Sequence, residues 1–91
     1  MNLNLCRDEA KRFLEQIGAE TEADEKIFQM LSDEIEELKR SIGDNVRTCH
    51  QVYDVLFLLF EFAAKYDLDL DAEWEKGRQK KAAKYQTAKN G

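Results

Sequence analysis

The amino-acid sequence predicts an all-α fold, a four-helix antiparallel bundle whose core is completed by dimerisation. The 91 residues include no proline, with 43% hydrophobic and 36% charged, which is typical of one helical globular domain. Apolar residues recur at helical spacing, and no stretch alternates as a strand does. Residues 52–64, VYDVLFLLFEFAA, are apolar almost all round a helix. A chain of this size buries such a helix only at its centre or against a second copy.

The first two helices are predicted from their stop signals and apolar faces. Residues 4–17 form the first, which ends at Gly18 because glycine readily adopts the left-handed conformation of helix ends. Thr21 is predicted to cap the second helix, which runs to about residue 42. The apolar face of the first helix consists of Leu5, Phe13, Leu14 and Ile17, and the core stripe of the second of Ile27, Leu31, Ile35, Leu38 and Ile42.

A short corner leads to the third helix. Gly43 ends the second helix and Asp44 caps the third, which is predicted over residues 45–66. Helices joined so closely must be antiparallel neighbours. Residues 67–71 form the next connection, with Asp69 or Asp71 as the cap of a basic fourth helix over residues 72–88. On that helix we expect Trp74 and Tyr85 to pack in the core or at an interface.

The charge is distributed unevenly, so the two ends of the chain suit different ligands. The net charge is −5, but residues 1–45 hold twelve Asp and Glu against six Lys and Arg, whereas residues 72–91 hold two against six. The early acids suit a cation, and the basic end suits phosphate or an acidic neighbour. No basic stripe is interleaved with aromatic residues, so nucleic acid is not an expected partner.

The remaining composition points to a cytoplasmic protein. The apolar run is too short and too acidic to cross a membrane, and the first residues have acids where a signal peptide needs an apolar core. Cys6 and Cys49 are lone cysteines without CxxC spacing, which indicates a reducing compartment and no zinc site. We expect both to be inert and partly buried.

Four polar side chains are predicted to face a shared space. Glu34 and Glu37 lie three residues apart on one flank of the second helix, and Gln51 and Asp54 are related in the same way on the third. The corner at Gly43 brings the two pairs to a similar height. Three carboxylates and one amide oxygen suit Mg²⁺ or Mn²⁺. The alternative is that Glu34 and Glu37 are ordinary surface acids; Asp54, inside an apolar run, is less easily explained in that way.

These residues carry a family resemblance. Glu34-x-x-Glu37, thirteen further residues, a half-motif ending in Asp54, an apolar helix and then AAKYDLDLDAEWEKGRQKKAAKY resemble the MazG-like all-α nucleoside triphosphate pyrophosphohydrolases, over about residues 28–85 of this single domain. The resemblance implies a MazG-like oligomer that uses Mg²⁺ to cleave a nucleoside triphosphate to the monophosphate and pyrophosphate. It also implies Glu34, Glu37 and Asp54 as catalytic metal ligands, with Gln51 at the fourth position and Asp33 where relatives often carry another Glu.

The chain departs from the family pattern at Gln51, where a Glu is expected. Gln has a carbonyl oxygen for a metal but lacks the charge, which weakens a divalent site. An alternative function is therefore a weakened or inactive nucleotide-binding, regulatory or oligomerisation module. His50 is a candidate base by its ordinary pKa, but we expect it to face away from the Gln51 and Asp54 flank and to make only a polar contact. The candidate phosphate contacts are Lys76, Lys80, Lys81 and Lys84, and a solvated helix face is the alternative.

Overall fold

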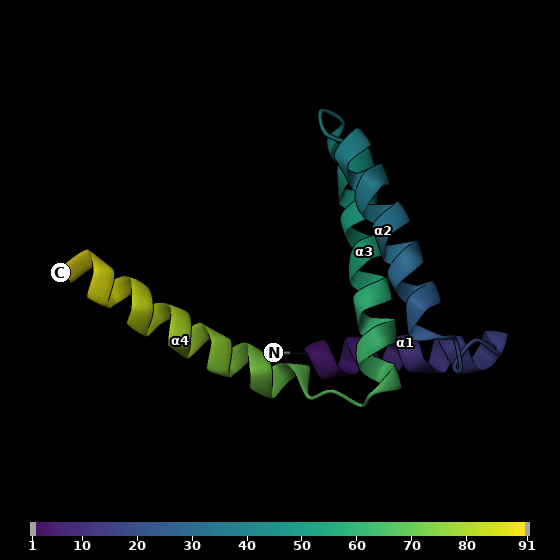
Figure 1. Cartoon of the computed structure of the whole chain (residues 1–91), viewed down its shortest axis with the longest axis horizontal. Coiled ribbons are helices and arrows are strands. Elements are labelled where there is room, and N and C mark those ends of the chain that lie inside the picture. The colour runs from purple at the N-terminus through teal and green to yellow at the C-terminus, as the bar shows by residue number, and fades with distance from the viewer. Residues whose placement is uncertain (1, 91) are drawn as a thin grey trace.

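The protein consists of four helices joined by short connections (Figure 1). The computed structural model describes the backbone of residues 2–90 and the side chains of residues 2–86, and no strand occurs in that backbone. The helices are α1 (Leu3–Ile17), α2 (Asp24–Arg40), α3 (Asn45–Lys65) and α4 (Leu70–Asn90). The predicted all-α class and the number of helices are therefore confirmed.

The helices α2 and α3 form an antiparallel hairpin, as the short corner predicts. Asp44 caps α3 because its Oδ1 accepts a hydrogen bond of 3.2 Å from the Arg47 N–H. Gly43 turns the chain with a φ of +102°, in the left-handed region that favours glycine. Ser41 is fully buried, and its backbone carbonyl accepts a hydrogen bond of 2.8 Å from the Thr48 hydroxyl across the corner. These contacts fix the register of the hairpin.

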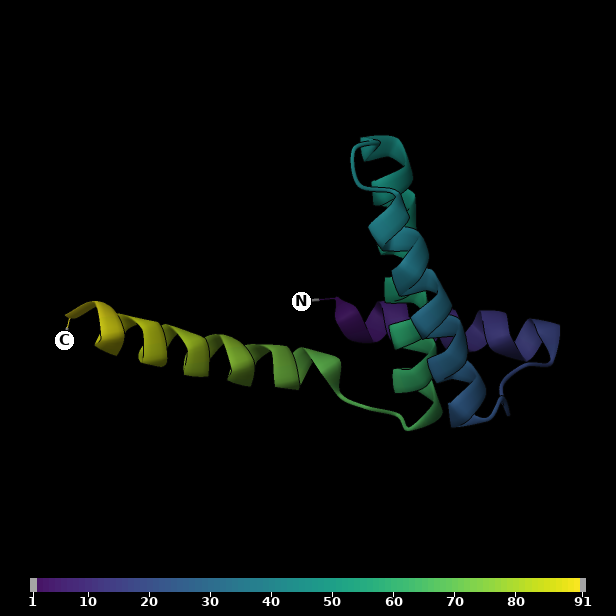
Figure 2. The same cartoon turned by 45° about the horizontal axis from the view of Figure 1, so that its top comes forward.

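The first helix does not run alongside the hairpin but crosses its base, as the two views show (Figures 1 and 2). Buried Ala10 and Leu14 form its inner face, and the Phe13 ring meets the Phe57 ring of α3 edge to face at 5.5 Å. As predicted, α1 ends at Gly18, whose φ is +72°. The Ala19 N–H then bonds to the Leu14 carbonyl at 2.9 Å, which closes the helix.

The last helix extends away from the other three (Figures 1 and 2). It has no continuous apolar face, so it lacks a surface with which to lie along the hairpin. The predicted four-helix packing is thus reduced, within one chain, to a compact unit of α1, α2 and α3 with α4 as an arm. Trp74 and Tyr85 remain exposed on this arm, so their predicted core packing does not occur within the chain.

The arm is attached to α1 by reciprocal capping. The Asn4 side-chain oxygen accepts a hydrogen bond of 2.8 Å from the Leu70 N–H at the start of α4, and the Leu3 N–H at the start of α1 donates one of the same length to Asp71 Oδ1. Asp69, one of the two predicted caps, accepts from the Ala72 N–H at 3.1 Å. Hydrogen bonds from Asn4 and from the Ala72 backbone lower the pKa of Asp69. Each helix therefore satisfies backbone donors of the other.

The chain buries little apolar surface. Its accessible area is 7,052 Å², whereas a compact monomer of this mass exposes about 5,500 Å². Val52, Leu56 and Leu59 form an exposed stripe along α3, each more than two-fifths accessible. In the described part of the chain, the buried apolar residues are Ala10, Leu14, Ile27, Leu58, Ala63 and Ala64.

Three local predictions are wrong. The cap residue of α2 is Ala23 rather than Thr21, and it makes no side-chain capping bond. Ile42 lies beyond the end of α2 and is 74% exposed, because α2 ends at Arg40 and the corner begins at Ser41. Cys6 and Cys49 are exposed rather than partly buried.

Candidate functional site

The register of the hairpin places Glu34 on α2 opposite Asp54 on α3. Contacts at its two ends fix this alignment: the Ser41–Thr48 pair lies at the corner, and the Lys65 ammonium lies 2.5 Å from Asp24 Oδ1 at the base. Both acids lie midway between these ends. Both acids line the same groove.

Glu34 and Asp54 line an open groove of about 850 Å³. Two further carboxylates, Glu9 from α1 and Asp33 from α2, line the same groove. Aromatic side chains line the groove beside these acids, and the Tyr53 and Phe57 rings lie 6.0 Å apart along α3. The other lining residues are Cys6, Ala10, Phe13, Met30, Leu56, Leu58 and Phe60. The groove therefore combines negative charge with flat apolar surfaces.

Glu37 and Gln51, the other two predicted ligands, do not line this groove. Glu37 Oε1 lies 2.6 Å from the Arg40 guanidinium, one turn further along α2. Gln51 Oε1 is buried and has no hydrogen-bond partner among the described residues. The structure therefore separates the four predicted ligands into Glu34 and Asp54, which share the groove, and Glu37 and Gln51, which lie nearer the corner.

His50 does not face away from Asp54, contrary to our expectation. Its Nε2 lies 3.3 Å from Asp54 Oδ2, and the imidazole is largely exposed. The two residues are four apart on α3 and so lie on one face of the helix, a spacing that the sequence already displayed. His50 therefore orients the Asp54 carboxylate from the corner side of the groove.

The four candidate phosphate contacts lie on α4 and not at the groove. Lys76, Lys80, Lys81 and Lys84 are exposed on α4, and none of them lines the groove. Lys84 instead places its ammonium 5.8 Å from the centre of the Tyr85 ring. Within one chain, α4 thus carries these lysines away from the acids.

Sequence reasoning missed the contribution of α1. Glu9 reaches the groove because α1 crosses the hairpin, an arrangement with no local signal in the sequence. Asp33 was singled out only through the family resemblance, and it too lines the groove.

The donor set fits Mg²⁺ in the way that proteins usually bind it. This ion is commonly held by one or two carboxylates, and water and substrate phosphate fill its other positions. Glu34 and Asp54 supply two such carboxylates beside open space. Within the residues that the structure describes, no three Asp, Glu, His or Cys side chains gather closely enough to hold a metal ion by themselves.

Comparisons with protein-family models, with curated proteins and with solved structures yield no match to this chain. The resemblance to the MazG-like enzymes therefore stays a prediction drawn from the residues. In the described part of the chain, no helix has the length and apolar character needed to cross a membrane.

Proposed function

We propose that the chain is a Mg²⁺-dependent nucleotide pyrophosphohydrolase that cleaves a nucleoside triphosphate to the monophosphate and pyrophosphate. One observation carries this proposal: Glu34 and Asp54 come from two helices and line one groove that Tyr53 and Phe57 also line. Carboxylates beside open space suit a cation that bridges to phosphate. Tyr53 and Phe57 offer flat faces to a base.

In this proposal the side chains have separate tasks. Glu34 and Asp54 hold the cation, and His50 keeps the Asp54 carboxylate oriented through its contact at 3.3 Å. Glu9 and Asp33 add negative charge that favours a divalent ion in the groove. When bound, Mg²⁺ neutralises phosphate charge and lowers the pKa of a coordinated water. The aromatic side chains of the groove position the nucleotide against these acids.

Pyrophosphate release from a panel of ribo- and deoxyribonucleoside triphosphates with Mg²⁺ or Mn²⁺ tests the proposal. Glu34→Gln and Asp54→Asn, which keep side-chain size, should each lower release by about a hundredfold, because each removes charge that stabilises the developing phosphate charge through the cation. Glu36→Gln is the matched control, since Glu36 lies on the same helix, pairs with Lys39 at 3.0 Å and does not line the groove. Absence of release from the wild-type chain, or equal release from all variants, contradicts the proposal.

A second candidate function is a weakened nucleotide-binding or assembly module. It is favoured by the position of Glu37, which pairs with Arg40, and by the uncharged Gln51, since neither lines the groove. This alternative predicts that nucleotide binds in the groove, or that the chain only assembles, without release of pyrophosphate. Fluorescent-nucleotide binding measured beside the release assay distinguishes the two functions.

We further propose that two copies associate through the exposed stripe Val52, Leu56 and Leu59. The accessible area of 7,052 Å² exceeds that of a compact monomer of this mass by roughly 1,500 Å². A standard interface buries about 800 Å² on each partner, so the excess is ample for a dimer. A dimer also brings a second α4, with its lysines, into the assembly.

A further inference from the structure

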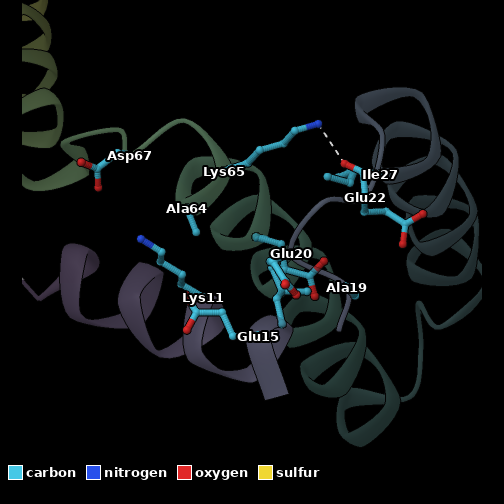
Figure 3. Close-up of a pocket in the computed structure, with 11 residues that line it drawn as sticks. Lys11, Glu15, Ala19, Glu20, Glu22, Ile27, Ala64, Lys65 and Asp67 are labelled. Carbon is cyan, nitrogen blue, oxygen red and sulfur yellow. Dashed lines mark hydrogen bonds between the residues drawn. The ribbon is translucent and has the colours of Figure 1, made fainter. Parts of the chain in front are cut away.

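A second cavity, of about 330 Å³, lies where the end of α1, the α1–α2 connection and the last turns of α3 meet (Figure 3). No residue lines both this cavity and the groove that contains Glu34 and Asp54. The volume is at the lower end of the range for small-molecule sites, about 300–1,000 Å³. The proposed pyrophosphohydrolase activity makes no use of this cavity.

Glu61 on α3 lines the cavity and is its most unusual group. The residue is only 9% exposed, and among the described residues its carboxylate has neither a hydrogen bond nor an ion pair. Burial, and in second place the nearby Glu22 carboxylate, raise the pKa of Glu61. A buried carboxylate is costly unless it has a partner. The cavity therefore contains a carboxyl group that has no partner among the described residues.

The lysines of the cavity do not supply that partner. The Lys65 ammonium is held by Asp24 Oδ1 at 2.5 Å and by the Glu22 backbone carbonyl at 2.8 Å. Figure 3 draws the hydrogen bond to Glu22 as a dashed line. The Lys11 side chain extends on the Asp67 side, away from Glu20 (Figure 3). Two other carboxylates that line the cavity, Glu15 and Glu20, make no ion pair within the described residues. The unmatched charge of the cavity is thus negative.

The other groups at the cavity fit a small ligand with an apolar part. Leu14, Ile27 and Ala64 contribute apolar wall from α1, α2 and α3. The charged and titratable groups that face Glu61 are Lys11 and Glu15 from α1, Glu20 and Glu22 from the connection, and Lys65 and Asp67 at the end of α3.

We propose that this cavity binds a small organic cation, whose ammonium or guanidinium head pairs with the Glu61 carboxylate while a short apolar tail packs against Leu14, Ile27 and Ala64. The ligand gives the Glu61 carboxylate the partner that it lacks among the described residues. Because only the ionised carboxylate pairs with a cation, affinity should increase as the pH rises through the elevated pKa of Glu61.

Titration of the isotope-labelled chain with butylammonium chloride, followed by amide chemical shifts at constant ionic strength, tests this proposal. Saturable shifts should centre on Ala19, Glu22 and Ala64, which border the cavity. Glu61→Gln should weaken binding by at least about tenfold, because it removes one partner of a buried charge pair. Glu36→Gln, an exposed change outside the cavity, should bind like the wild type, and MgCl₂ should not produce these shifts.

Three results would overturn the proposal: no saturable shifts, equal affinity in Glu61→Gln, or the same shifts with MgCl₂. If butylammonium does not bind but Glu61→Gln weakens self-association in sedimentation, the counterion is a side chain of a second copy, and the small-cation site is likewise refuted. If circular dichroism shows that Glu61→Gln does not fold, the pH dependence of butylammonium affinity for the wild type tests the proposal instead. An affinity that does not increase with pH would contradict pairing with Glu61.

Discussion

Two carboxylates of α3, Asp54 in the groove and Glu61 in the cavity, have different surroundings. Asp54 lies at the edge of an open groove, about one-third exposed, beside the His50 imidazole. Glu61 lies two turns further along α3, is buried, and has no partner among the described residues. The first environment suits exchangeable ligands and water, and the second suits one tightly held counterion.

Glu61→Gln should stabilise the fold at neutral pH. The substitution keeps the shape but removes a buried, unpaired charge, so the free energy of unfolding should rise by about 1 kcal/mol. Because the pKa of Glu61 is raised in the folded state, the wild type is relatively most stable below the ordinary Glu pKa and loses that stability as the pH rises through the raised value. The difference between variant and wild type should therefore vanish at acidic pH.

Urea unfolding at several pH values measures this effect. Glu36→Gln, at an exposed and ion-paired position, serves as the control and should lack the same pH trend. A Glu61→Gln chain that is less stable than the wild type at neutral pH would show that Glu61 makes a favourable interaction.

Residue-level prediction succeeded where the signal was local. Gly18 ends α1, and Asp44 and Asp69 cap α3 and α4, as their residue types predict. Gly43 lies in the corner with a positive φ, but α2 already ends at Arg40. The contact of His50 with Asp54 was equally local, at a spacing of four, and our contrary expectation came from a wrong estimate of its direction on the helix. The unpartnered Gln51 oxygen depends on burial between two helices, which no local pattern encodes.

At the scale of the elements, the junction of α1 with α4 determines the direction of the arm. Asn4 acts as a cap for α4 although it belongs to α1, and its amide also donates to Asp69 Oδ1 at 2.9 Å. Asp71, in α4, in turn accepts a hydrogen bond from the Leu3 N–H at the start of α1. The partners are more than sixty positions apart in the chain, so spacing arguments do not reveal them.

Asn4→Ala should therefore loosen the arm. It removes the acceptor for the first N–H groups of α4, at a cost typical of a lost helix cap, about 1 kcal/mol. Amide hydrogen exchange at residues 70–73 should accelerate while exchange in the hairpin is unchanged. Asn2→Ala is the matched control, because Asn2 precedes α1 and makes no side-chain capping bond. Equal effects from the two substitutions would contradict the proposed capping role of Asn4.

The hairpin was the most predictable element and α1 the least. Apolar spacing and a Gly43–Asp44 corner define two adjacent antiparallel helices. The crossing of α1 depends on how Leu14 and Phe13 fit against α3, which is a property of packed shapes rather than of the sequence pattern. For this reason the acids of α2 and α3 in the groove were anticipated, whereas Glu9 was not.

At the scale of the whole molecule, the compact unit is small and the arm is long. The radius of gyration is 16.1 Å, whereas a compact chain of this length has about 12 Å. Much of α3 remains apolar and exposed on the side that carries Leu56 and Leu59. Covering this stripe with a second copy, as proposed above, would add buried apolar surface to a small fold.

The paired substitution Val52→Glu and Leu59→Glu, at two positions of the stripe that do not line the groove, should prevent self-association. Both side chains are about half exposed, so the change places two like charges in the proposed interface at little cost to the compact unit. Light scattering after gel filtration should give a dimer mass for the wild type and the mass of one chain, 10.6 kDa, for the variant. Gln16→Glu, at an exposed site on α1, should remain dimeric. A monomeric wild type would refute the interface.

Paramagnetic broadening by Mn²⁺ tests most directly whether the acids of the groove form the catalytic centre. Amide spectra of the labelled chain would be recorded with substoichiometric Mn²⁺ and a non-hydrolysable α,β-imido nucleoside triphosphate. We predict that broadening centres on Glu34 and Asp54, that it spreads to Tyr53 and Phe57, and that Asp54→Asn abolishes it. Broadening centred on the cavity around Glu61 or on exposed acids outside the groove, or broadening unchanged in Asp54→Asn, would contradict the proposed site.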